Sequence, residues 1–329
     1  MAHGAVIFGC EGLVVTDWER TFFRDSDPLG FILFARNVVD PAQLQKLTAD
    51  LRETVGWQAP ILIDQEGGRV QRLRAPHWRE YLPALEQMEL AHDPLRAHYI
   101  RNRLIAHELH NVGIDVNCAP LADLVERTTH PVLKNRLYGS DLETVVAAAD
   151  CCANAFLAGG VLPVLKHIPG YGRAAVDSHK ALPRVNATRA ELNARDFAPF
   201  QRLNHMAMGM TAHIVFEDID PDAPATTSAK MMNVIREDIG FHGLIMSDDL
   251  SMEALSGTPF DRAAATIAAG CDIVLHCNGE PDQMRAVAEA SGEMSTQARI
   301  RADVALDQRK TPDDIDIRSF DAELAALLG

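Results

Sequence analysis

Eight short apolar segments recur along the chain, and this repetition constrains the fold more than any other feature. Each segment is followed by polar or glycine-rich residues and then by a helical pattern. They are AVIFGCEG from Ala5, GFILFAR from Gly30, APILIDQEGG from Ala59, IDVNCAPLADL from Ile114, VLPVLKHIPG from Val161, AMGMTAHIVF from Ala207, GLIMSDD from Gly243 and CDIVLHCNG from Cys271. Apolar runs alternating with helices are typical of a covered parallel sheet, and eight such units can close into a barrel. The sequence therefore predicts an α/β fold of the (β/α)8 TIM-barrel class.

Capping residues mark the helices between these segments. We predict helix starts at Asp40-Pro41, Ser140-Asp141, Thr188 with Glu191, and Thr258-Pro259. Three of these helices are expected to end at Gly56, Gly159-Gly160 and Gly270. The polar, helical stretch from about Gly292 onward is interpreted as a cover on the barrel.

An open, doubly wound sheet would show the same alternation of strands and helices. Its usual sign is a strand that leads into a GxGxxG or GxxxxGK[ST] turn, and the sequence has neither motif. An α/β barrel commonly uses about 250 residues as one domain. We therefore expect residues 1–329 to form a single catalytic barrel domain.

The composition indicates an ordinary globular protein. Hydrophobic residues make up 47% of the chain and charged residues 23%, while 46 Asp and Glu against 31 Lys and Arg give a net charge of -15. Such a charge repels a phosphate backbone, so we expect no nucleic-acid partner. The six cysteines form no CxxC pair, and we find neither a signal peptide nor an apolar run of about 18 residues. These features favour a cytoplasmic protein without a membrane partner. We expect a monomer, although none of these features determines the oligomeric state.

Polar residues at the ends of the apolar segments are the candidates for chemistry, because a barrel of this class carries its active site at the carboxyl ends of its strands. They are Asp64 to Arg72, Lys166-His167, His213 and Ser247-Asp248-Asp249. Buried polar groups at such positions are costly unless they are paired or functional. Side chains alternate along a strand, so we expect only one of Asp248 and Asp249 to point into the mouth.

The segment from Lys166 to His179 predicts a long loop above the same end of the barrel. It contains two glycines and a proline, and it ends with Asp177 and His179 two residues apart. A neighbouring carboxylate can orient an imidazole and raise its basicity, which suits a histidine acid/base. Arg72, Arg136 and Lys166 could act as hydrogen-bond clamps, with Asp64 accepting from sugar hydroxyls.

Four motifs together resemble the single-domain β-N-acetylhexosaminidases of glycoside hydrolase family 3, the NagZ type that acts in bacterial cell-wall recycling. They are IDQEGGRVQR at 63–72, NRLYG at 135–139, KHIPGYG at 166–172 with DSH at 177–179, and SDDLSM at 247–252. They occur in the order that the family shows and span almost the whole predicted barrel. One departure is Tyr171, where the family commonly has a second histidine, and another is Ile168 in place of a phenylalanine.

The resemblance implies a role for each matching residue. Asp248 would be the nucleophile, and His179 the general acid/base oriented by Asp177. The N-acetylglucosamine ring would be held by Asp64, Arg72, Arg136, Lys166 and His167. The implied reaction is retaining hydrolysis through a glycosyl-Asp248 intermediate, and the implied substrate is a cytosolic muropeptide, with no metal and no organic cofactor.

Three other classes remain as alternatives. A metal-dependent barrel hydrolase would use His167, His179, His213 and Asp248 as ligands, although such barrels generally carry an early HxH that AVIFGCEG lacks. A Schiff-base lyase would use Lys166, which lacks an apolar setting to lower its pKa. A sugar-binding module would need neither a nucleophile nor an acid/base pair.

Overall fold

The computed structural model of the protein describes residues 3–175 and 181–329. Within these residues, nine parallel strands form one sheet in the order β5-β4-β3-β2-β1-β11-β10-β8-β6. Their bounds are β1 Gly4–Gly9, β2 Pro28–Leu33, β3 Ile61–Ile63, β4 Val116–Asn117, β5 Leu162–Pro163, β6 Leu165–Ile168, β8 Met208–Thr211, β10 Leu244–Asp249 and β11 Ile273–His276. A separate parallel pair joins β7, Arg184–Val185, to β9, Val215–Phe216.

The sheet curls into a nearly closed barrel. Strands β5 and β6 stand at opposite ends of the strand order, yet they are neighbours in the chain. Strand β4 pairs with β5, and Leu121, which follows β4, forms a parallel bridge with Lys166 of β6. The predicted TIM-type barrel is therefore confirmed, and the open doubly wound sheet is excluded.

Two predicted strands are each divided in the structure. The segment from Val161 forms β5 and β6. It is divided at Val164, whose N–H donates both to the Asn117 carbonyl of β4 and to the Ala119 carbonyl that follows β4, so the pairing shifts along the neighbouring segment. The segment from Ala207 forms β8 in the barrel, and then β9, which pairs outside the barrel with β7. Short apolar runs indicate burial, but they do not show where a strand changes partner.

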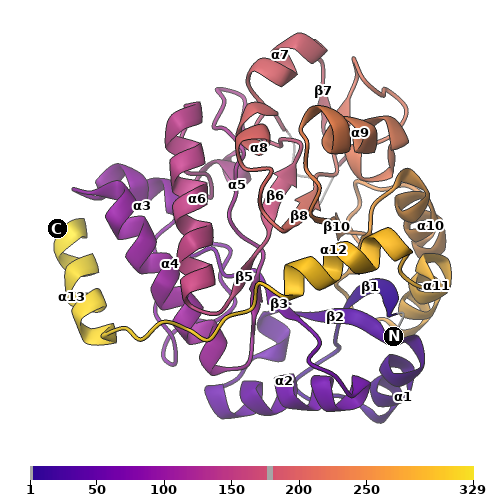
Figure 1. Ribbon diagram of the computed structural model, residues 1–329, viewed down its shortest axis with the longest axis horizontal. Coiled ribbons are helices and arrows are strands. Elements are labelled where there is room, and N and C mark those ends of the chain that lie inside the picture. The colour runs from indigo at the N-terminus through magenta and orange to yellow at the C-terminus, as the bar shows by residue number, and fades with distance from the viewer. Residues whose placement is uncertain (1–2, 176–180) are drawn as a thin grey trace.

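Helices surround the strands on the outside (Figure 1). They are α1 Asp17–Ser26, α2 Pro41–Val55, α3 Ala84–Leu90, α4 Pro94–Asn111, α5 Pro131–Lys134, α6 Leu142–Ala158, α7 Arg189–Ala194, α8 Ala198–Arg202, α9 Ala229–Asn233, α10 Pro259–Ala269, α11 Pro281–Ser291, α12 Thr296–Leu306 and α13 Ile317–Leu328. The four predicted helix starts are confirmed: each N-cap side chain, from Asp40, Asp141, Thr188 and Thr258, accepts a hydrogen bond from the first turn.

The barrel interior is a packed apolar core. Buried side chains such as Ile7, Leu62 and Met246 fill it, and burying one such side chain contributes about 1.5–3 kcal/mol. Helix α12 lies across one end of the barrel (Figure 1) and adds Ala298 and Ala302 to the same core. The expected cover is therefore confirmed for α12, and it closes the end opposite the carboxyl ends of the strands.

The final helix, α13, packs on α4 at the side of the barrel (Figure 1). Arg96 of α4 binds Glu323 through two hydrogen bonds of 2.6 and 2.8 Å, and Arg79 binds Asp321 in a similar way.

Among the described residues, no helix is both long enough and apolar enough to cross a membrane.

Candidate active site

A cavity of about 220 Å³ opens at the carboxyl ends of the barrel strands. Its walls combine charged groups with apolar side chains from the mouths of β2, β8 and β11. The lining residues are Ile32, Phe34, Asp64, Arg69, Val70, Arg72, His130, Val132, Leu133, Arg136, Lys166, His167, Tyr171, Met210, Asp248, Asp249, Met252, Leu275 and Cys277. This volume lies below the roughly 300–1,000 Å³ of sites for drug-sized ligands and suits one small polar unit.

Asp64 follows β3 directly, and the loop after it returns to bring Arg72 to its side. The Gln65 side chain closes this loop, because its Oε1 accepts from the N–H groups of Arg72 and Leu73 at 2.8 and 3.1 Å. The Arg72 guanidinium then donates to Asp64 Oδ2 at 3.2 Å. The local sequence thus fixes both residues on one wall of the cavity.

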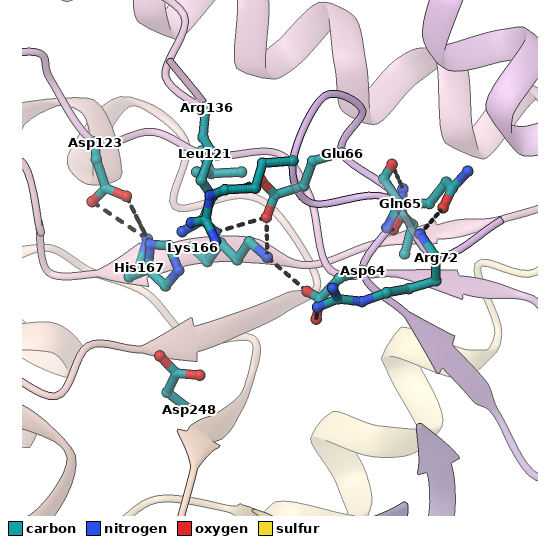
Figure 2. A network of polar contacts seen from close by, with 12 residues as sticks. Asp64, Gln65, Glu66, Arg72, Leu121, Asp123, Arg136, Lys166, His167 and Asp248 are labelled. Atoms are coloured by element: carbon teal, nitrogen blue, oxygen red, sulfur yellow. Dashed lines mark hydrogen bonds and ion pairs between the residues drawn. The ribbon is translucent and has the colours of Figure 1, made fainter. Parts of the chain in front are cut away.

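Asp64, Glu66, Arg136 and Lys166 form one buried ionic cluster, drawn in Figure 2. Lys166 Nζ lies 2.9 Å from Asp64 Oδ1 and 2.7 Å from Glu66 Oε1. Arg136 donates from Nε and from one terminal nitrogen to the two oxygens of Glu66, both at 2.8 Å. Charges buried at this depth persist only when they are paired and hydrogen-bonded, as they are here.

The cluster keeps all four groups ionised. Burial alone would raise the pKa of Asp64, but Lys166 and Arg72 outweigh it and hold that pKa well below its usual range. Burial opposes the charge of Glu66 in the same way, and Arg136 with Lys166 lowers its pKa to about 2. The carboxylates in turn raise the pKa values of Lys166 and Arg136 against the effect of burial. A lysine with a raised pKa is a poor amine nucleophile, which argues against a Schiff-base lyase.

His167 follows Lys166 on β6 and is held by Asp123, which comes from the segment after β4. His167 Nδ1 lies 2.8 Å from Asp123 Oδ2, and the second oxygen of Asp123 accepts from the backbone N–H of Tyr171 at 2.7 Å. In a neutral imidazole, a carboxylate at Nδ1 favours the tautomer that is protonated there, which leaves Nε2 to accept from a ligand hydroxyl. Asp123 therefore orients the imidazole and ties the following loop to the same point.

Asp248 and Asp249 end β10, and both border the cavity. The expectation that only one of them reaches the mouth is wrong, because the pairing of β10 with β11 shifts between Met246 and Asp249 and breaks the simple alternation. Asp249 is occupied: it accepts from Ser251 N at 3.0 Å, Ser251 Oγ at 2.5 Å and Cys277 N at 3.1 Å.

The Asp248 carboxylate is much less engaged than that of Asp249. Among the described residues it accepts one hydrogen bond, from the backbone N–H of Asp249 at 2.8 Å. It lies half-buried at the strand end, apart from the ionic cluster (Figure 2). An ionisable group at this position in a cavity is a candidate for chemistry.

The structure brings together six of the residues singled out in the sequence. Asp64, Arg72, Arg136, Lys166, His167 and Asp248 all line the one cavity. Asp177 and His179 lie outside the described residues. His213 does not join the cavity lining, because its ring nitrogens contact Thr226 Oγ1 at 2.7 Å and the Asp249 carbonyl at 2.9 Å. Within residues 3–175 and 181–329, no group of three or more His, Cys, Asp or Glu side chains could hold a metal ion.

Glu66 and Asp123 take part in the site, but the sequence assigned a role to neither; Glu66 lay within the candidate segment Asp64 to Arg72 and Asp123 was not singled out. Glu66 stands two residues after Asp64, and side chains two apart on an extended segment share a face, so this spacing was a usable signal. Asp123 ends the apolar segment that precedes Lys166-His167. Carboxyl ends of neighbouring barrel strands meet, and this adjacency was the second signal.

Comparison with known proteins identifies the family. The model of the glycosyl hydrolase family 3 N-terminal domain matches residues 10–306. The chain belongs to glycosyl hydrolase family 3. Within this family, it is 37% identical over 295 residues to a β-hexosaminidase of Alkalilimnicola ehrlichii, covering 87% of this chain and 84% of that protein. A β-hexosaminidase of Neisseria meningitidis serogroup C is 34% identical over 317 residues, covering 93% of this chain and 85% of that protein.

Solved structures of family 3 proteins agree with this assignment. NagZ of Neisseria gonorrhoeae, in complex with N-trifluoroacetyl-D-glucosamine, superposes with a TM-score of 0.88 at 30% identity, covering 100% of this chain and 99% of that one. A family 3 β-N-acetylglucosaminidase from Paenibacillus gives a TM-score of 0.84 at 30% identity, covering 96% of this chain but 62% of the longer protein. The chain is accordingly an enzyme, a family 3 glycosidase of the β-N-acetylhexosaminidase type.

Proposed function

We propose that the enzyme is a retaining exo-β-N-acetylglucosaminidase that acts as one catalytic domain and forms a covalent glycosyl intermediate on Asp248. The observation that carries this proposal is the contrast within one cavity. Asp64, Lys166 and Arg136 on one wall are each held in an ion pair, the last two by Glu66 behind them. The Asp248 carboxylate on the other wall accepts one hydrogen bond among the described residues. Fixed hydrogen-bonding groups suit sugar binding, and a lightly engaged carboxylate suits attack on the anomeric carbon.

The ionic cluster would bind the hydroxyls of the terminal sugar. Asp64 can accept from them, while Arg72, Arg136 and Lys166 can donate, and His167 Nε2 offers a further acceptor. Apolar side chains of the lining, among them Phe34 and Met210, suit the carbon face of the ring or the acetamido methyl group. The small cavity favours one terminal sugar over an internal unit of a long chain.

The chemical steps follow from these roles. In the first, Asp248 Oδ attacks the anomeric carbon while His179, oriented by Asp177, gives a proton to the departing glycosidic oxygen. In the second, His179 removes a proton from water, which attacks the same carbon and releases Asp248. Two inversions at one carbon give retention of configuration.

The resemblance of the four sequence motifs extends the proposal to the natural substrate. We infer that the enzyme removes N-acetylglucosamine β-linked to 1,6-anhydro-N-acetylmuramic acid, with or without peptide, in the cytoplasm and without a metal or organic cofactor. Such turnover would belong to the recycling of cell-wall fragments, and through it to cell shape and division.

The test is hydrolysis of a panel of p-nitrophenyl glycosides together with the anhydro-disaccharide. We expect turnover of the β-N-acetylglucosaminide, much slower turnover of the β-glucoside and none of the α-anomer. Proton NMR of the fresh product should show the β-anomer first, before mutarotation. Release of the α-anomer would exclude a covalent intermediate, and turnover that EDTA abolishes would favour a metal-dependent hydrolase.

A further inference from the structure

Glu66 stands behind the cavity wall. Its side chain is 4% exposed, and it is absent from the groups that line the cavity. The two cations that it contacts, Lys166 and Arg136, both belong to the lining. Glu66 therefore reaches the ligand space only through them.

One carboxylate joins these two cations. Oε1 of Glu66 lies 2.7 Å from Lys166 Nζ and 2.8 Å from a terminal nitrogen of Arg136, while Oε2 accepts from Arg136 Nε at 2.8 Å. Asp64 contacts Lys166 and Arg72 but forms no hydrogen bond with Arg136 among the described residues. The charge of Arg136 opposes that of Lys166. Because like charges repel strongly in a buried setting, the shared carboxylate offsets this repulsion and allows both cations to contact it.

The backbone holds Glu66 in place. Its N–H donates to the Val70 carbonyl at 2.8 Å, and its own carbonyl accepts from the guanidinium of the fully buried Arg101. Gly67 follows with φ of 94°, and a Cβ atom there would collide with the Arg101 guanidinium, so glycine is required at this position. Arg101 is itself anchored by Gln87 Oε1 at 3.1 Å. Because its backbone is fixed in this way, Glu66 can hold the side chains of Lys166 and Arg136 in place although it does not line the cavity itself.

We propose that Glu66 is a positioning residue that fixes the spacing and direction of Lys166 and Arg136 so that both donate to the same sugar ring. Lys166 donates one of its three N–H groups to Asp64, and its ammonium also forms an ion pair with Glu66 at 2.7 Å. Glu66 takes two of the five donors of Arg136. The other donors of both cations belong to side chains that line the cavity. The inference rests on the proposed sugar-binding role of Lys166 and Arg136.

Asp272 supplies a matched control. Its side chain is also 4% exposed, and it also joins two cations, Arg236 at 2.6 Å and Arg301 at 2.7 Å. It precedes β11 at the end of the barrel that α12 covers, far from the cavity lining. Asp272→Asn therefore reports the cost of removing a buried bridging carboxylate at a place where neither the carboxylate nor its two cations line the cavity.

The experiment compares Glu66→Gln, Glu66→Asp and Asp272→Asn by thermal unfolding and by kcat and KM on p-nitrophenyl β-N-acetylglucosaminide. We expect both Glu66→Gln and Asp272→Asn to lower Tm. In Glu66→Gln, kcat/KM should fall about 10–100-fold, the range typical when a residue that orients a binding group is lost. Most of this loss should come from a rise in KM. The kcat/KM of Glu66→Asp should lie between that of Glu66→Gln and that of the wild type. Asp272→Asn should keep the wild-type kcat/KM.

A second readout does not need turnover. The groups that face the Lys166 ammonium are Asp64, Glu66, Arg136 and the thiol of Cys118, and the two carboxylates raise its pKa. The carbon-13 chemical shift of the Lys166 ε-carbon at neutral pH should therefore change in Glu66→Gln, which removes the ion pair at 2.7 Å, and stay unchanged in Asp272→Asn. If the wild type turned over no N-acetylglucosaminide, the proposed function would fail while this chemical shift still tested the coupling.

Two results would overturn the inference. The first is a folded Glu66→Gln enzyme with wild-type kcat, wild-type KM and an unchanged chemical shift of the Lys166 ε-carbon. The second applies if Glu66→Gln does not fold: Glu66→Asp keeps the charge but draws the carboxylate back by one methylene, and wild-type kinetics in that variant would show that the spacing does not matter.

Discussion

The two walls of the cavity differ in how fully their charges are paired. On the wall built by β3, β6 and their loops, Lys166 contacts Asp64 and Glu66, and Arg136 contacts Glu66, at 2.7–2.9 Å, with Glu66 behind the wall. On the wall formed by β10, Asp249 is saturated with hydrogen bonds, but Asp248 accepts from one backbone N–H among the described residues. The difference teaches that a fixed binding surface and a reactive group need opposite degrees of pairing within one site.

The first way to test this contrast is to remove the lightly engaged carboxylate. We expect Asp248→Ala to reduce kcat by a factor on the order of 10⁴ or more, as for other lost nucleophiles. We expect a wild-type Tm, because the half-buried side chain accepts one hydrogen bond among the described residues. Mass spectrometry after trapping with a 2-fluoro or 5-fluoro sugar should find the label on Asp248. Label on Asp249 would move the nucleophile by one residue, and no label would favour attack by the substrate acetamido oxygen.

The second test concerns His179, which the proposal assigns to proton transfer. General acid catalysis contributes roughly 10²–10⁴-fold, and most of it is needed when the leaving oxygen is basic. His179→Ala should therefore lose most of its activity on the anhydro-disaccharide, and much less in the first step on a nitrophenyl glycoside. Slow deglycosylation should then give a burst of nitrophenol, measured by stopped flow.

Asp177→Asn tests the residue that the proposal assigns to orienting His179. It should show the same dependence on the leaving group as His179→Ala, but with a smaller loss of activity, because the imidazole is retained but is less basic and less well oriented. Equal losses for both leaving groups in His179→Ala, without a burst, would assign this histidine to binding or folding instead of proton transfer.

The third test probes the paired wall through pH. The folded-state pKa of Glu66 is about 2, against an ordinary value of 4.5, and that of Asp64 is also depressed. A depressed carboxyl pKa contributes stability that is fully present above the unfolded value and is lost as pH falls through the folded value. The free energy of unfolding from urea titrations should therefore drop as pH falls from about 5 towards 2.

Glu66→Gln is the control for this pH dependence. Because the variant lacks one of the depressed carboxyls, its stability should fall less steeply over the same window, and the gap from the wild type should narrow with decreasing pH. Parallel curves for the two proteins would mean that Glu66 is not held ionised by its partners in the folded state.

The smallest expected effect concerns Asp249. Asp249→Asn should lower the free energy of unfolding by about 1–3 kcal/mol, because the amide cannot accept all the hydrogen bonds from Ser251 and Cys277. Its loss of kcat/KM should be far smaller than that of Asp248→Ala. Urea denaturation and steady-state kinetics measure the two effects, and a loss of activity equal to that of Asp248→Ala would erase the distinction between the two aspartates.

The sequence by itself determined the architecture and most of the residues that meet in the cavity. Period, apolar runs and caps are local properties, so the eight units and the helix starts at Asp40, Asp141, Thr188 and Thr258 could be predicted from short windows. Because the carboxyl ends of the strands share one face of a barrel, the sequence also predicted that Asp64, Lys166 and Asp248 lie together, and all three line the cavity.

Only the tertiary structure decided the pairings. The bond of Glu66 to Arg136 spans 70 positions, and that of Asp123 to His167 spans 44, so no local pattern records either contact. The shift in β10 that brings Asp249 as well as Asp248 to the cavity depends on β11, the neighbouring strand. Which carboxylate is saturated and which remains lightly engaged depends on groups that meet only after the barrel has closed, and for that reason the chemical contrast within the site belongs to the fold.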